Sequence, residues 1–191
     1  MCNSTRLVAL KQNPLWDFAL DFYTRPEVEA ACLCLQEQAQ VDVCELLFHA
    51  WLYRHGLEAK PDALANERQA RLRWQQEVTG VLRELRGALK GQAQTNNGVA
   101  QLRATIKEAE LLAERENLQR WQQWALLPEI SSPERLKNIA QWPCNATRWL
   151  QLQFFSPHFH LLSEGAGEEP LTVKSAWGVM GNQLDRFTRA R

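Results

Sequence analysis

Two long segments without proline, joined by a short polar turn, constrain this chain most. The first covers residues 62–90 and the second residues 99–127, and both carry apolar residues at a helical, heptad-like spacing. Residues 91–98, GQAQTNNG, have the composition of a turn. Two long helices with so short a connection must lie antiparallel. We therefore expect a helical hairpin, with a bend near Gly80 because glycine costs about 1 kcal/mol relative to alanine inside a helix.

The segment NPLWDFALDFY, residues 13–23, predicts an earlier helix that other helices enclose. Asn13 can act as its N-cap and Pro14 is suited to the first helical position. Its apolar side chains cover an arc of about 200° at 100° per residue. Only the side that carries Asp17 and Asp21 is then free to meet water or a cation.

Two more helices are predicted directly after it. Pro26 marks the start of one, which shows a single apolar stripe up to residue 39. Asp42 and Glu45 form an acidic version of the capping box and begin the next, which is apolar nearly all round and ends before Gly56. We expect this third helix at the centre of the molecule.

The signals after Pro128 are weaker. Residues 132–142 predict a short helix, and residues 145–155 predict another rather than a strand, because no partner strand is visible. Residues 172–189 predict a closing amphipathic helix. The fold class is thus all-α: an irregular helical bundle with a long antiparallel hairpin. We divide it into a core domain of residues 1–127 and a helical extension, residues 128–191, packed on that core.

Charge and composition narrow the possible functions. Lys plus Arg and Asp plus Glu each number 22, so the whole chain has no net field that would attract nucleic acid or anionic lipid. The longest apolar run, residues 46–53, is far shorter than the roughly 20 residues of a membrane span. We therefore expect a cytoplasmic protein that does not enter a membrane, with its five cysteines reduced.

Four blocks of the sequence resemble a bacterial family called domain of unknown function 2390. They are NPLWDFALDFYTRPEVEAACLCLQ, VDVCELLFHAWL, VLRELRGALK and IKEAELLAERENL, and the resemblance covers about residues 13–127. It implies an all-α cytoplasmic protein and supplies no established activity or catalytic residue. Glu27 stands where the family pattern commonly has glycine, and the part after Pro128 lies outside that pattern.

A basic cluster on the hairpin is the first candidate site. Arg83, Arg86 and Lys90 fall within about 60° of one another on one helix, while Glu110 and Glu114 flank the apolar stripe of the other. One interpretation is interhelical ion pairing that sets the register of the hairpin. The alternative is a basic surface that binds an anion or an acidic partner.

Tryptophans near the end of the hairpin form a second candidate. Four of them bracket the region interrupted by proline: Trp121, Trp124, Trp142 and Trp149. They either pack inside the molecule or remain exposed as apolar anchors for a partner.

A metal site is a third candidate. Asp17, Asp21, Glu110 and Glu114 would offer hard oxygen ligands for Mg²⁺ or Mn²⁺ if the two helices faced each other. This is the basis of the alternative function, a small metal-dependent hydrolase.

Histidines offer weaker chemical signals. Cys144, His158 and His160 lack the spacing of a zinc site. His49, one turn after Glu45, suggests a hydrogen-bonded histidine at the core edge, with acid–base chemistry as its alternative.

Nucleic-acid binding would depend on one stretch, Arg68, Arg71 and Arg73, and only if Glu67 and Glu77 left it unopposed. We do not expect it. The sequence contains no motif for phosphate binding, for a serine nucleophile or for a zinc hydrolase, and no cofactor is predicted. These observations favour a non-enzymatic intracellular adaptor or regulatory protein. It would bind another, unidentified protein through the hairpin and the flanking tryptophans.

Overall fold

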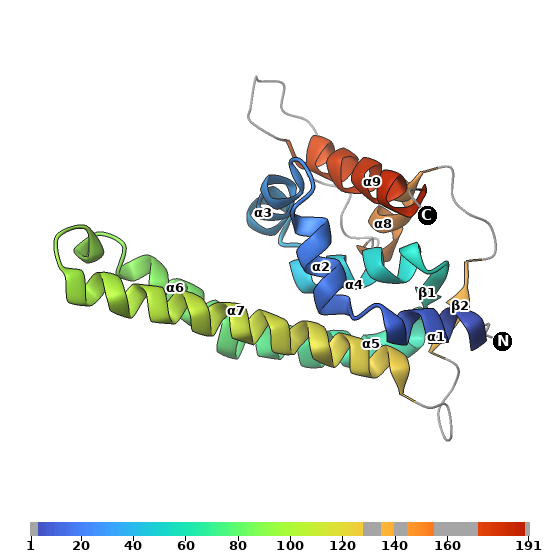
Figure 1. Ribbon diagram of the computed structural model, residues 1–191, viewed down its shortest axis with the longest axis horizontal. Coiled ribbons are helices and arrows are strands. Elements are labelled where there is room, and N and C mark those ends of the chain that lie inside the picture. The colour runs from blue at the N-terminus through green and yellow to red at the C-terminus, as the bar shows by residue number, and fades with distance from the viewer. Residues whose placement is uncertain (1–3, 128–134, 140–144, 155–171, 190–191) are drawn as a thin grey trace.

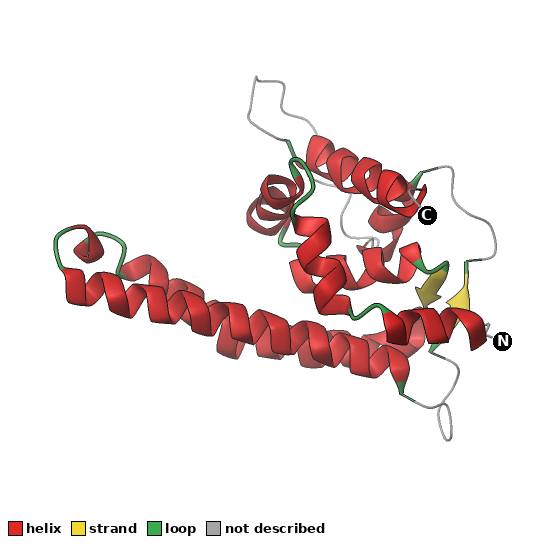
Figure 2. Cartoon of the chain, in the orientation of Figure 1, coloured by secondary structure: helices red, strands yellow, loops and turns green. Residues whose placement is uncertain are grey.

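The computed structural model describes residues 4–127, 135–139, 145–154 and 172–189. The predicted all-α class is confirmed, and two short strands join the helices (Figures 1 and 2). In chain order the elements are α1 (Ser4–Gln12), α2 (Leu15–Tyr23), α3 (Val28–Ala39), α4 (Val43–Arg54), β1 (Leu57–Ala59), α5 (Pro61–Trp74), η1 (Gln75–Thr79), α6 (Gly80–Ala88), η2 (Gln92–Gln94), α7 (Asn97–Leu126), β2 (Leu136–Asn138), α8 (Ala146–Phe154) and α9 (Val173–Arg189).

The antiparallel hairpin predicted from the sequence is confirmed. Helices α5 and α6 run against α7, and α6 with the first part of α7 projects from the body of the molecule as an arm (Figure 1). Asn96 caps α7, since its side chain accepts hydrogen bonds from the amides of Gly98 and Val99. The turn at the tip of the arm is therefore marked by a signal that is local in the sequence.

An irregular turn replaces the simple bend expected near Gly80. The five residues of η1 form a π-helical turn, with Gly80 directly after it. A Cβ atom at Gly80 would lie 2.9 Å from the carbonyl oxygen of Gln75, closer than packed atoms allow. Glycine at this position thus permits the π-turn.

The predicted start of α4 is confirmed, whereas the starts of α2 and α3 differ from the prediction. Asp42 accepts a hydrogen bond of 3.0 Å from the amide of Glu45. Asn13 does not cap α2. Its side chain donates to the carbonyl of Ala9, because the unpredicted helix α1 ends there and offers a free carbonyl. Helix α3 begins after Glu27, which adopts a left-handed conformation with φ 64°.

Helix α4 lies at the centre of the core, as predicted, and α8 and α9 pack around the same core. Phe18 and Phe22 are buried and contact Phe187 of α9. The enclosure of α2 is less complete than expected, since Leu20 remains 50% exposed. The aromatic side of α2 is nevertheless the side that other helices cover.

A small antiparallel sheet was not predicted. Strand β1 pairs with β2, with Leu57 opposite Asn138 and Ala59 opposite Leu136. The helix expected over residues 132–142 is therefore wrong in its described part, because the backbone of residues 136–138 bonds to a strand far away in the sequence. The helices expected over residues 145–155 and 172–189 are confirmed as α8 and α9 in their described parts.

Candidate functional site

Ion pairs inside the hairpin occupy most of the predicted basic cluster. Arg83 bonds to Glu110 and to Glu114, each at 2.9 Å, and Arg86 Nε lies 2.5 Å from Glu110. Burial alone would raise the pKa of Glu110, but hydrogen bonds from Arg86 and Arg83 outweigh it and the pKa is lowered. Lys90 is exposed, and no ion pair to it is found within the described part of the chain. The geometry thus fits the ion-pairing interpretation and leaves no open basic face at the two arginines.

The predicted carboxylate metal site is not assembled. Glu110 and Glu114 are engaged by arginines of α6, whereas Asp21 on α2 lies 3.9 Å from Arg25. Over residues 4–127, 135–139, 145–154 and 172–189, no group of three or more His, Cys, Asp or Glu side chains could hold a metal ion. The four acids of this alternative therefore do not form a metal-binding group among the described residues, since arginines of α6 engage Glu110 and Glu114 while Asp21 lies beside Arg25.

Three of the four tryptophans are buried instead of exposed. Trp121 stacks on Phe48 with ring centroids 4.7 Å apart, and Trp149 packs against Tyr53 at 5.0 Å. Trp124 is buried beside Trp121. The prediction that these three act as exposed anchors is wrong, since α4 and its neighbours cover them. Trp142, like Cys144, His158 and His160, lies outside the described residues.

An apolar face lies on the hairpin side opposite the ion pairs. Val81 and Leu85 lie one turn apart on α6, and Leu85 lies about 200° around the helix from Arg83. Leu112 lies about 200° around α7 from Glu110, so it too points away from the ion pairs. Leu102, about 80° around α7 from Leu112, borders this side. We call Val81, Leu85, Leu102 and Leu112 the outer face.

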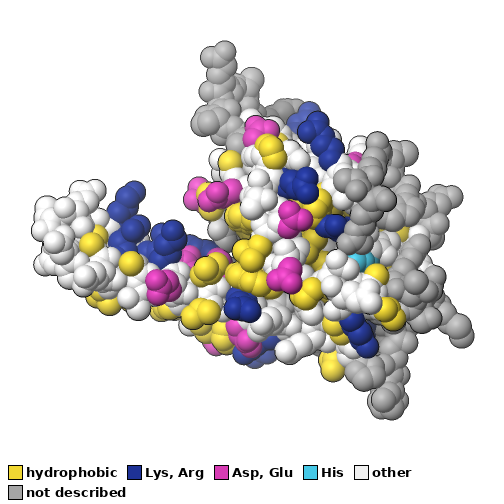
Figure 3. Space-filling model, in the orientation of Figure 1, with side chains coloured by type: hydrophobic (Ala, Val, Ile, Leu, Met, Phe, Trp, Pro, Cys, Tyr) yellow, Lys and Arg dark blue, Asp and Glu magenta, His cyan; other side chains and the backbone are white. Residues whose placement is uncertain are grey.

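Each member of the outer face is about half exposed. The exposed fractions are 54% for Val81, 48% for Leu85, 52% for Leu102 and 63% for Leu112. Figure 3 shows apolar side chains at several points along the arm, with Lys and Arg along its upper edge. The ion-pair side faces the body. Arg83 is close enough to lower the pKa of Asp42, and Glu114 is close enough to raise the pKa of Tyr23. The outer face therefore points away from the body.

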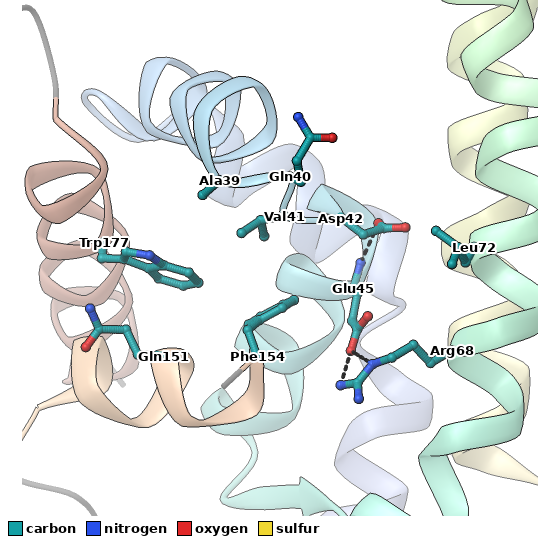
Figure 4. A pocket seen from close by; sticks show the side chains of 10 residues that line it. All are labelled: Ala39, Gln40, Val41, Asp42, Glu45, Arg68, Leu72, Gln151, Phe154 and Trp177. Atoms are coloured by element: carbon teal, nitrogen blue, oxygen red, sulfur yellow. Dashed lines mark hydrogen bonds and ion pairs between the residues drawn. The ribbon is translucent and has the colours of Figure 1, made fainter. Parts of the chain in front are cut away.

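A pocket of about 310 Å³ lies between the body and the base of the arm (Figure 4). Helices α3, α4, α5, α8 and α9 contribute to it, together with the connection from α3 to α4. The residues that line it are Ala39, Gln40, Val41, Asp42, Glu45, Arg68, Leu72, Gln151, Phe154 and Trp177. Gln40 turns the chain there with a left-handed φ of 53°, which brings Asp42 to the start of α4.

Glu45 and Arg68 form the ionic part of the pocket wall. Arg68 Nε lies 2.7 Å from Glu45, and Arg68 Nη2 also donates to the backbone carbonyl of Gln153. His49 lies 3.4 Å from Glu45 on its other side. Burial would raise the pKa of Glu45, but bonds from His49 and Arg68 reverse this and lower the pKa. Glu45 is therefore a carboxylate with its charge already compensated.

The acid–base alternative for His49 finds little support in this geometry. His49 is fully buried, does not line the pocket, and its Nδ1 has no hydrogen-bond partner among the described residues. Burial lowers the pKa of His49, and the opposing effect of Glu45 does not reverse this. A buried histidine of lowered pKa that does not line this pocket cannot exchange a proton with a substrate bound there.

Asp42 is the pocket acid whose charge is not compensated. Burial and the nearby Glu45 raise its pKa to about 6, although amide hydrogen bonds and Arg83 act in the opposite direction. No basic side chain in the described part of the molecule forms an ion pair with it. The sequence identified Asp42 as a helix cap, but not as a pocket residue, because Phe154 and Trp177 come from remote helices.

The arginine stretch considered for nucleic acid is opposed by acids. Arg68 is held by Glu45, and Arg71 Nε lies 2.9 Å from Glu67. These two side chains do not form a free basic face with Arg73.

Comparison with known proteins gives one match. Residues 14–121, more than half of the chain, match the model of a family described as a protein of unknown function, DUF2390. No curated protein and no solved structure matches the chain. None of the described helices combines the length and apolarity needed to cross a bilayer. The chemistry must therefore be argued from the residues of this chain.

Proposed function

This chain belongs to the DUF2390 family, and we propose that it is a non-enzymatic intracellular adaptor or regulatory protein that binds another protein through the outer face of its hairpin arm. The observation that carries the proposal is the half-exposed row of Val81, Leu85, Leu102 and Leu112. Apolar groups in such a row on a projecting arm are the usual sign of a binding surface. The buried tryptophans have no part in it.

The partner of the outer face is best matched by an amphipathic helix. The exposed apolar side chains of α6 and α7 offer surface to a third helix, which can pack along two antiparallel helices as in a bundle. Binding would bury the exposed parts of the four side chains at about 25 cal/mol per Å². The ion pairs of Arg83 and Arg86 would keep the two helices in register beneath that partner.

Two further observations support the adaptor over the metal-dependent hydrolase. Glu110 and Glu114 are paired with arginines, which removes the carboxylate cluster that a hydrolase would use. The thiols of Cys32 and Cys44 are free and buried, in keeping with a reducing intracellular setting.

Site-specific photo-crosslinking in the native cell tests this proposal. A benzophenone amino acid replaces Leu85 on the outer face, and in a second strain it replaces Lys107. Lys107 is exposed and lies about 140° around α7 from Leu112. We expect a discrete crosslinked protein from position 85 that is absent at position 107.

The double variant Val81→Ser with Leu112→Ser tests whether the crosslink depends on the outer face. It shortens two outer-face side chains and leaves Arg83 and Glu110 unchanged, so the hairpin keeps its ion pairs. We expect the crosslink from position 85 to fall by about tenfold or more, as the loss of two apolar contacts predicts. Equal products from positions 85 and 107, or a crosslink unchanged in the double variant, would refute the proposal.

A further inference from the structure

The pocket beside Asp42 has the make-up of a small-molecule site. Its volume of about 310 Å³ lies within the range of ligand pockets, which are mostly apolar with a few placed polar groups. Phe154 and Trp177 form an aromatic wall with ring centroids 5.7 Å apart, and Val41 and Leu72 add apolar surface. Figure 4 shows Asp42 and Glu45 across the pocket from Trp177. An apolar body and a polar head could both be accommodated.

The charged side chains that line the pocket determine which ligand charge it favours. Glu45 and Arg68 compensate each other, and Arg68 is further held by the carbonyl of Gln153. The remaining charge is the carboxylate of Asp42, which is held in place because its Oδ1 caps α4. Its donors in the described part of the chain are the backbone amides of Glu45 and Cys44. An anionic ligand would be repelled by Asp42, whereas a cation would supply the missing opposite charge.

We propose that this pocket binds a small organic cation, with the cationic nitrogen on the carboxylate of Asp42 and an apolar body against Phe154 and Trp177. Aromatic faces also attract cationic nitrogen, which adds to the preference. A metal ion is a poorer match, since no cluster of three metal-ligating side chains is found among the residues described. This site is separate from the outer face of the hairpin and does not depend on the adaptor role.

Isothermal titration of the whole chain with benzamidine tests the proposal. Benzamidine is a planar aromatic cation, benzamide is its neutral counterpart of similar shape, and benzoate is the anion. At pH 7.5 we expect benzamidine to bind about tenfold or more tightly than benzamide, as a charge-assisted hydrogen bond predicts. We expect no measurable binding of benzoate.

Two matched variants locate the binding. Asp42→Asn removes the charge and retains a residue that caps helices well, so α4 should keep its start. Asp17→Asn makes the same change at a second, more polar hollow bordered by Asp21 and Arg54. We expect the first variant to lose benzamidine affinity by about tenfold or more. The second should bind as the unmodified chain does.

The pH dependence gives a further readout. Affinity for benzamidine should fall as the pH drops through 6, because Asp42 then takes up a proton, while Glu45 stays charged beside Arg68 and Arg83 stays cationic. Any of three results would overturn the proposal: equal binding of benzamidine and benzamide, no binding of benzamidine, or full affinity in Asp42→Asn.

Discussion

Asp42 stabilises the structure in one respect and destabilises it in another. As the N-cap of α4 it satisfies the amide of Glu45, a contribution of about 1 kcal/mol. Its raised pKa of about 6, against 3.8 for the unperturbed group, means that the folded chain disfavours its charge. Asp42 thus keeps the cap but places a disfavoured charge in the pocket, whereas asparagine would cap the helix without that charge.

Asp42→Asn should therefore stabilise the free protein at neutral pH. The folded state binds the proton more tightly than the unfolded state, so Asp42 favours folding below about pH 4 and this benefit is lost as the pH rises through about 6. We expect the variant to unfold at higher urea, with a gain of about 1–2 kcal/mol at pH 7.5. The gain should shrink toward pH 4. Equal destabilisation at both pH values would contradict this.

Left-handed backbone at two residues is a second feature at this scale. Glu27 with φ 64° and Gln40 with φ 53° flank α3, and a Cβ in this conformation costs about 1–2 kcal/mol. Glu27→Gly and Gln40→Gly should each raise the free energy of unfolding by about 1 kcal/mol. Glu37→Gly, on the exposed right-handed interior of α3, should lower it by a similar amount. Urea unfolding of the three variants compares them; a loss at all three positions would exclude strain at the first two.

At the scale of elements, the π-turn η1 separates α5 from the arm. Gly80 follows it at a place where a side chain would press on the carbonyl of Gln75, whereas nothing lies within 4 Å of a Cβ at Gly87. The same substitution on the same helix should thus have opposite effects.

Gly80→Ala and Gly87→Ala test this difference. We expect Gly80→Ala to lower the free energy of unfolding by about 1–2 kcal/mol, because the π-turn must shift. Gly87→Ala should raise it by about 0.5–1 kcal/mol through helix propensity. Thermal unfolding followed by circular dichroism measures both. A gain at both positions would show that the turn at Gly80 adapts without cost.

Elements whose signals lie close together in the sequence could be predicted. The hairpin, the cap at Asp42 and the stop at Gly56 follow from residues close in sequence, and the structure has all three. Strand β2 could not be predicted, because the strand it pairs with is β1, whose Leu57 lies opposite the distant Asn138. The cap role of Asn13 was wrong for a related reason, since α1 offered it a competing carbonyl.

The candidate sites, too, could be predicted where local spacing decides them and not where tertiary packing does. Ion pairing of Arg83 and Arg86 with Glu110 follows from helical spacing and was among the interpretations offered. The pocket was missed, because Asp42 meets Phe154 and Trp177 only when α8 and α9 return to the body. For Trp121 the sequence left burial and exposure both open, because its burial depends on the tertiary packing in which Phe48 stacks on it.

At the scale of the whole molecule, the body and the arm carry different candidate sites. The body encloses its aromatic residues around α4 and holds the pocket, while the arm carries an apolar face that no described element covers. The ion pairs between α6 and α7 lie on the body side, so a partner could bind the outer face without disturbing them. The two proposed sites, the outer face and the pocket, are thus separate in space.

Labelling of single cysteines by N-ethylmaleimide, in the native cell and after purification, tests most directly whether a partner covers the outer face. The positions compared are Leu85→Cys on the outer face and Lys107→Cys on the other side of the arm. Cys2 and Cys144 are replaced by serine in both chains, and the buried thiols of Cys32, Cys34 and Cys44 react slowly. We predict that position 85 reacts about fivefold or more slowly in the cell than after purification, with no such difference at position 107. Equal ratios at the two positions would contradict a bound partner on this face.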